Sequence, residues 1–90
     1  MEHHRTDLGE NYMKDEDAVS LIIKEYGRAL NAHPPFNSAH EGYAVIKEEL
    51  DELWDEIKKS GRTGADLDRM KEEASQVAAM ALRFMVDICV

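Results

Sequence analysis

Apolar residues recur every three or four positions through most of the chain, and this spacing restricts what the chain can fold into. A period of three to four residues places side chains on one face of an α-helix. No segment alternates between apolar and polar residues for long enough to predict a β-strand. The sequence therefore predicts an all-α fold.

The first predicted helix runs from about Asp15 or Asp17 to Ala32. Acidic residues at its start suit the positive end of the helix dipole. Pro34 and Pro35 end it, because proline has no backbone N–H to donate and restricts the residue before it. Residues 1–14 are polar and are expected to form an arm outside the domain, which spans residues 15–90. The apolar stripe of this helix comprises Val19, Ile22, Ile23, Tyr26, Ala29 and Leu30.

Asn37 or Ser38 can cap a second helix that runs to about Ser60, with Gly61 as its stop. A third helix is expected after a turn over residues 61–64 and continues nearly to the C-terminus. The apolar face of the second helix comprises Tyr43, Ile46, Leu50, Leu53, Trp54 and Ile57. The third helix starts near Ala65 or Asp66, and its stripe comprises Leu67, Met70, Ala74, Val77, Ala81, Phe84 and Ile88.

The length of 90 residues allows one domain at most. A chain of this size buries only roughly 60–65% of its unfolded surface, so its own core is marginal. Cys89 is the only cysteine, so no disulfide within the chain can compensate. The three helices are also longer than a compact three-helix monomer needs. We therefore expect the protein to self-associate.

The formal net charge of −8 argues against a nucleic-acid partner, because binding to a phosphate backbone needs clustered Lys and Arg. A nucleotide substrate remains compatible, because bound divalent cations reverse the local sign of an acidic pocket. The apolar stretches are too short to span a bilayer, and the N-terminus is polar rather than a signal peptide. The expected protein is soluble and cytoplasmic, with no membrane partner.

Two acidic runs of the same spacing lie in the second and third helices. On a helix, positions i and i+3 are neighbours, so each run can present two oxygens to one point. Two such helices face to face would form an oxygen cage suited to a hard divalent cation. The first run comprises Glu48, Glu49 and Glu52, and the second comprises Glu72, Glu73 and Gln76.

Helical geometry places both runs on the same flank of their apolar stripes. Angles around the helix axis are measured from Ile46 on the second helix and from Met70 on the third. Glu49 and Glu73 then lie at ~300° on their helices, and Glu52 and Gln76 lie at ~240°. Glu48 falls near ~200° and is expected to be more exposed. A solvated, salt-bridged face remains the alternative, because acids beside bases on a helix usually form one.

The stretch from about Phe36 to Ile88 resembles the all-α nucleoside triphosphate pyrophosphohydrolases of the MazG-like family, and looks like a small MazG-related branch. The signature of that family is EExxE, followed on the next long helix by ExxD. Residues 48–52 (EELDE) match the first half fully. Residues 73–76 (EASQ) match the second half except at the last position, and the small-residue run over 77–82 also fits.

The resemblance implies Mg²⁺-dependent hydrolysis between the α- and β-phosphates of a nucleoside triphosphate, giving a nucleoside monophosphate and pyrophosphate. Mn²⁺ is an alternative cation. Glu49, Glu52 and Glu73 are then expected to ligate the metal, and Glu48 is expected to ligate it or to bond to a ligand. These four carboxylates are the predicted catalytic residues. The family also builds a four-helix core from two chains, so a homodimer or homotetramer is expected.

Gln76 stands where the family has a carboxylate. Its amide oxygen can coordinate a cation but carries no charge, so cation affinity should fall. Gln76 could ligate with a lower metal count, contact the substrate through its amide, or mark a site that has lost catalysis. In the last case the chain would be a non-catalytic helical oligomer that binds a nucleotide or a protein partner.

Three further side chains are candidate substrate contacts. Lys58 and Arg62, at the end of the second helix and beyond it, could neutralise phosphates, although cations also favour the end of a helix without any ligand. His40 could contact a base or a phosphate, and its alternative role is a surface or packing residue. Tyr43 and Trp54 have core spacing and are expected to pack rather than to stack on a base.

Overall fold

The computed structural model describes residues 13–59, 61 and 63–90. These residues form three helices, which are α1 (Asp15–Ala32), α2 (Ala39–Lys59) and α3 (Gly64–Ile88). The predicted all-α fold is confirmed for this part of the chain. Of the predicted N-terminal arm, residues 1–12 lie outside the described residues. None of the helices in the described part is both long and apolar enough to span a membrane.

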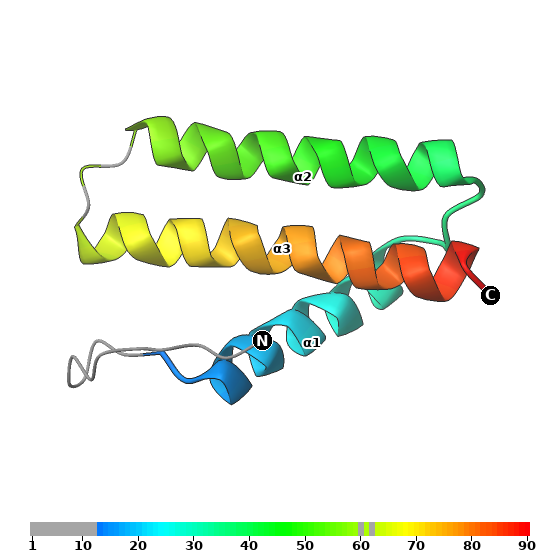
Figure 1. The fold of residues 1–90 in the computed structure, drawn as a ribbon, viewed down its shortest axis with the longest axis horizontal. Coiled ribbons are helices and arrows are strands. Elements are labelled where there is room, and N and C mark those ends of the chain that lie inside the picture. Colours follow the sequence, from blue (N-terminus) through cyan, green and yellow to red (C-terminus); the bar gives the residue numbers. More distant parts are fainter. Residues whose placement is uncertain (1–12, 60, 62) are drawn as a thin grey trace.

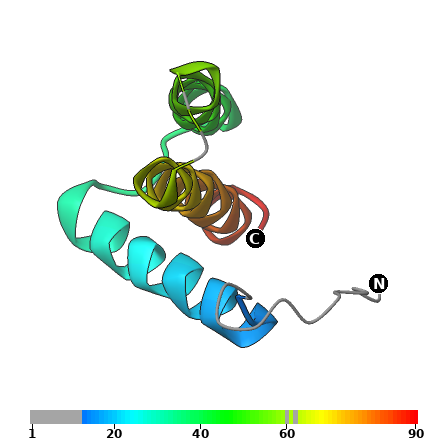
Figure 2. The ribbon, with the colours of Figure 1, turned by 90° about the vertical axis from the view of Figure 1, so that its left-hand side faces the viewer.

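α3 is the central helix, because α1 and α2 both pack against α3 and make no contacts with each other. α2 and α3 run antiparallel as a long hairpin (Figure 1). Seen nearly along the hairpin, α1 and α2 lie on different sides of α3 (Figure 2). Ser75, Ala79 and Arg83 form a buried row along α3, spaced by one helical turn.

Arg83 ties the end of α1 to α3. Its side chain is 2% exposed, and its guanidinium donates to the carbonyls of Ala29 and His33, both at 2.7 Å. The Ala29 carbonyl also accepts the backbone N–H of His33 at 3.0 Å, so Arg83 adds a second hydrogen bond there and bonds to the His33 carbonyl just beyond the helix end. The guanidinium also donates to Asp87 at 3.1 Å, and Asp87 accepts the backbone N–H of Phe36 at 3.0 Å. The same ion pair therefore fixes the connection between α1 and α2.

Gly42 lets α2 approach α3 closely. A Cβ atom at this position would lie 2.5 Å from Cδ2 of Phe84 and 3.1 Å from the ring of Phe36. Real Cβ atoms essentially never approach a non-bonded heavy atom of another segment to within 3.0 Å. Only glycine fits this spacing of the two helices without a shift of the aromatic rings.

Side-chain caps mark the starts of α2 and α3. Ser38 Oγ accepts the backbone N–H of Glu41 at 3.1 Å, which confirms the predicted cap at Asn37 or Ser38. Thr63 Oγ1 accepts the backbone N–H of Asp66 at 3.1 Å, while the Asp66 carboxylate accepts that of Thr63 at 3.1 Å. This reciprocal pair is a capping box. Its hydrogen bonds, chiefly the one from the Thr63 side chain, lower the pKa of Asp66.

Few apolar side chains are buried in the isolated chain. Among the described residues only Ala29 and Ala79 are buried apolar side chains. Tyr43 and Trp54, which were expected to pack, are 64% and 55% exposed. The expected core-facing residues Val19 and Ile23 are exposed as well. The single chain therefore leaves large apolar residues of all three predicted stripes exposed to solvent.

The large exposed apolar residues of α2 and α3, except Val86, lie on one side of the hairpin. At about 100° per residue, they project from the side opposite to the acidic flanks of both helices. This surface, which we call the apolar face, comprises Tyr43, Leu50, Trp54, Ile57, Leu67 and Met85. The two sides of the hairpin thus differ sharply in chemistry.

Candidate metal centre and adjoining cleft

Three carboxylates converge where the middle of α2 packs on α3. One oxygen from each of Glu49, Glu52 and Glu73 lies within 4.8 Å of the other two. Glu49 and Glu52 are neighbours on α2 because they stand three residues apart, and antiparallel packing places Glu73 opposite them. The structure thus brings together three of the four predicted catalytic residues, which we call the carboxylate trio.

The carboxylate trio is electrostatically unfavourable without a counter-charge. Burial raises the pKa of Glu49 to about 7, and the hydrogen bond and charge of Glu52 act in the same direction. Burial also raises the pKa of Glu73, followed by the charge of Glu52. One oxygen of Glu49 and one of Glu73 are buried without a hydrogen-bond partner. A buried polar atom without a partner carries a desolvation cost, which a bound cation would offset.

The basic side chains nearby pair with other acids. On α2, Lys47 pairs with Asp51 at 3.0 Å, and Lys59 pairs with Glu56 at 3.3 Å. Arg69 of α3 also pairs with Glu56, at 3.1 Å. Among the ion pairs of the described residues, none includes a member of the carboxylate trio. A salt-bridged, solvated face therefore accounts for the outer side of α2 but not for the trio.

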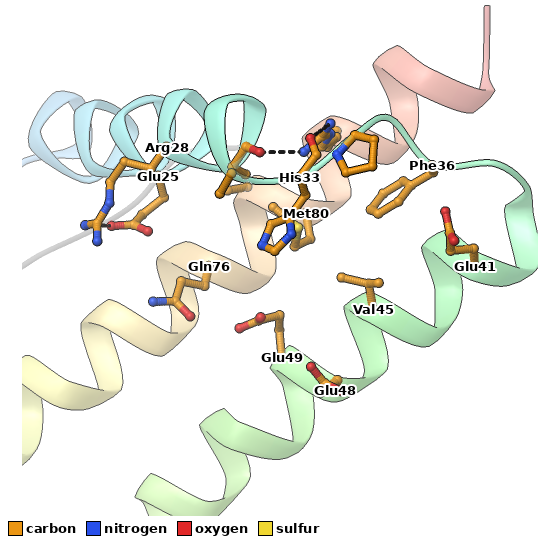
Figure 3. Close-up of a pocket in the computed structure, with 15 residues that line it drawn as sticks. Glu25, Arg28, His33, Phe36, Glu41, Val45, Glu48, Glu49, Gln76 and Met80 are labelled. Carbon is orange, nitrogen blue, oxygen red and sulfur yellow. Dashed lines mark hydrogen bonds and ion pairs between the residues drawn. The ribbon is translucent and has the colours of Figure 1, made fainter.

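A cleft of about 470 Å³ adjoins the carboxylate trio and shares Glu49 with it. Clefts that bind small molecules in proteins commonly measure about 300–1,000 Å³. Glu49 of α2 and Gln76 of α3 both point into this cleft, across from α1 (Figure 3). The cleft is lined by Glu25, Arg28, Ala29, Ala32, His33, Pro34, Phe36, Glu41, Val45, Glu48, Glu49, Gln76, Ala79, Met80 and Arg83.

Only some of the remaining predicted site residues lie in the cleft. Glu48 is exposed, as expected, and lines the cleft together with Gln76. His40 is exposed in the first turn of α2 and does not line the cleft. Lys58 pairs with Asp55 at 3.3 Å, and its ammonium lies 5.9 Å from the centroid of the Trp54 ring rather than in the cleft. Arg62 lies outside the described residues.

The wall of the cleft that belongs to α1 and its connection to α2 was missed from the sequence. Arg28, His33 and Phe36 all line it. They were missed because the acidic runs mark only α2 and α3. The available signal was Arg83, which with Asp87 is one of two charged residues in the mainly apolar C-terminal part of the third helix. A buried arginine needs acceptors, and here they belong to the end of α1.

Comparison with known proteins found no match: no protein-family model, no curated protein and no solved structure matches this chain. The expected membership of the MazG-like family rests on the two acidic runs and their order alone, and no comparison adds to it.

Proposed function

We propose that this chain is a metal-dependent nucleoside triphosphate pyrophosphohydrolase. The observation that carries the proposal is the carboxylate trio, in which two buried oxygens lack partners, beside a cleft of ligand size. Mg²⁺ prefers oxygen ligands and keeps several of its waters, so three carboxylates leave room for water and substrate. Mn²⁺ suits the same ligands. Cys89 is exposed and unpaired, which agrees with a reducing, cytoplasmic location.

Each residue of the site has a role in this proposal. Glu49, Glu52 and Glu73 hold the cation. A bound cation supplies Lewis acidity toward phosphoryl oxygens and lowers the pKa of a coordinated water. Glu48 lines the cleft beside the trio, where its carboxylate orients the water that attacks the α-phosphorus. Water adds at phosphorus as the bond to the bridging oxygen breaks, which gives a nucleoside monophosphate and pyrophosphate.

Glu49→Gln tests the proposal, because it keeps the size of the side chain and removes its charge. Pyrophosphate release should be measured for ribo- and deoxyribonucleoside triphosphates with Mg²⁺, with Mn²⁺ and with chelator. We expect release from at least one nucleotide with the metals only, and none from the variant at unchanged helical content. Asp51→Asn is the control, because Asp51 pairs with Lys47 on the exposed side of α2 and lies outside the trio. An active Glu49→Gln protein would rule out the proposed site.

A non-catalytic nucleotide-binding or protein-binding oligomer is the second candidate, and Gln76 favours it. Gln76 lines the cleft, so an uncharged amide faces the space beside Glu49. Gln76→Asp separates the candidates. Gain of both Mg²⁺ affinity and hydrolysis would indicate a decayed site. Loss of the activity of the natural sequence would show instead that the amide is adapted to its substrate.

We also propose that the apolar face of the hairpin packs against a second copy of the chain. Two hairpins that meet through this face form a four-helix core, with the carboxylate trios on the outer sides. The support is the small number of buried apolar residues in the single chain and the concentration of exposed ones on one surface. The resulting homodimer is the unit that we propose to be active, alone or as half of a tetramer.

A further inference from the structure

The cleft has two chemically different ends. Glu49 and Gln76 lie at one end, with Arg28 and its ion-pair partner Glu25 of α1 across from them (Figure 3). Phe36, Val45 and Met80 line the other end, where the Glu41 carboxylate also lies and accepts the backbone N–H of Asn37 at 2.7 Å. Because the carboxylate trio shares Glu49 with the polar end, a phosphate chain bound at the trio would enter there. The apolar end then faces the other part of the same ligand.

Phe36 is held as a rigid aromatic surface at the apolar end. Its backbone N–H bonds to Asp87, and its ring lies 5.8 Å from the guanidinium carbon of the buried Arg83. Gly42 leaves the space that the ring needs, since a Cβ there would lie 3.1 Å from it. An aromatic ring that is fixed before binding loses little conformational freedom on binding. Phe36 is therefore suited to hold another planar group.

His33 supplies a polar side chain beside this surface. Its carbonyl is fixed by Arg83, and its imidazole points into the cleft between Phe36 and Gln76 (Figure 3). An imidazole can donate or accept a hydrogen bond in the plane of its ring. A planar ligand with polar edges matches this combination better than a purely apolar ligand does.

We propose that the apolar end of the cleft binds the nucleobase of a nucleotide, with Phe36 as its stacking surface and His33 bonding to its edge. The identification of the ligand as a nucleotide rests on the proposed function. The phosphates run from the base past Gln76 and Arg28 toward the carboxylate trio. His33 and Phe36 are then the residues that set base preference.

The methyl groups of two methionines on α3 report on this proposal. Met80 lines the cleft, whereas Met85 is 63% exposed outside it. The folded protein, in chelator, is titrated with ribo- and deoxyribonucleosides while the methionine methyl resonances are recorded by NMR. The ring current of a bound base should shift the Met80 resonance and leave that of Met85 unchanged. If no nucleoside shifts Met80 more than Met85, the proposal is overturned.

Phe36→Leu and Phe84→Leu form a matched pair for the same titration. Both changes remove an aromatic ring beside Gly42, but only Phe36 lines the cleft. Loss of one stacked base contact weakens affinity by about tenfold or more. We expect this loss for Phe36→Leu and an unchanged affinity for Phe84→Leu, and equal effects of the two changes contradict the proposal.

Because nucleosides are uncharged, their titration measures base binding separately from nucleotide hydrolysis. Nucleosides carry no phosphate and need no metal, so their binding does not depend on the carboxylate trio. A Met80 shift in a protein that hydrolyses no nucleotide supports the base site and rejects the pyrophosphohydrolase. Hydrolysis without a Met80 shift rejects the base site and supports the pyrophosphohydrolase.

Discussion

Two glycines inside helices have opposite consequences for stability. Gly42 faces the Phe84 ring at the contact between α2 and α3, whereas a Cβ added at Gly27 of α1 would meet nothing within 4 Å. Glycine in a helix costs about 0.5–1 kcal/mol relative to alanine, unless the added methyl group has no room. The same substitution should therefore change stability in opposite directions at the two positions.

We predict that Gly42→Ala lowers the free energy of unfolding by about 1–3 kcal/mol, because the Cβ atom forces the Phe84 ring to move. Gly27→Ala, the matched control, should raise it by about 0.5–1 kcal/mol. Urea denaturation followed by circular dichroism measures both. If both variants gain stability, the close contact at Gly42 is not present in solution.

The raised pKa of Glu49 predicts how stability depends on pH. Its pKa is about 7 in the folded chain against 4.5 ordinarily, so the folded state binds more protons between these values. Stability is then greatest below the lower value and falls as pH rises toward the upper one. Glu73 acts in the same direction. The lowered pKa of Asp66 affects stability only at lower pH, where its contribution is lost as pH falls below the ordinary value of 3.8.

We therefore expect the melting temperature in chelator to fall as pH rises from 4.5 to about 7. Glu49→Gln should flatten this dependence, because the amide does not titrate. Saturating Mg²⁺ should restore stability at the upper end, since the cation replaces the proton and binds only the folded site. A melting temperature that rises across this interval in the natural sequence would contradict the burial of Glu49.

At the level of helices, Arg83 decides where α1 lies. Its guanidinium reaches the Ala29 and His33 carbonyls, which stand 54 and 50 residues away in the sequence. Removal of the buried cation takes one hydrogen bond from each of those carbonyls and leaves the Asp87 carboxylate without its counter-charge. Losses of this kind cost about 3–5 kcal/mol.

We predict that Arg83→Met releases α1 from α3 while the α2–α3 hairpin keeps its structure. Hydrogen exchange should show faster exchange of α1 amides and little change in α2. Arg28→Met is the control, because the Arg28 side chain is 70% exposed and, among the described residues, its ion-pair partner is Glu25 of the same helix. Surface pairs of this kind contribute about 0–1 kcal/mol. Similar exchange rates in the two variants would show that Arg83 does not hold α1.

The helices and the carboxylate trio could be predicted from the sequence because both follow from local spacing. Pro34, Pro35 and Gly61 break the pattern where helices end, and the angles of Glu49 and Glu73 follow from helical geometry. The cleft could not be predicted, because its α1 wall depends on hydrogen bonds of Arg83 across more than half of the chain. His40 and Lys58 were predicted to contact the substrate from their position on α2 alone, but neither side chain lines the cleft.

At the level of the whole molecule, the apolar face distinguishes this chain from a self-sufficient domain. Domains of this size bury only about 60–65% of their unfolded surface. Here all the large exposed apolar residues of the hairpin except Val86 share one surface. Exposed apolar surfaces of this kind mark sites of association. The core expected from the stripes is therefore complete only if a second chain covers this face.

We predict that the protein is a dimer or larger in size-exclusion chromatography with light scattering. Leu50→Lys combined with Trp54→Lys should yield monomers at the same concentration, because two charges would have to be buried in the interface. Ala44→Lys is the control, since Ala44 is exposed on α2 but lies outside the apolar face. A natural sequence that runs as a monomer, with its helices intact, would reject this interface.

The central position of α3 also has a consequence for synthesis on the ribosome. Chains emerge N-terminus first, and α1 and α2 are both made before α3. Among the described helices, α1 and α2 pack on α3 and not on each other, so neither can bury its packing face against another helix until α3 is translated. Until then their apolar stripes stay open to chaperones. Folding of this chain is thus deferred to the end of α3 synthesis, and a ribosome stalled before α3 would expose two helices that cannot fold against each other.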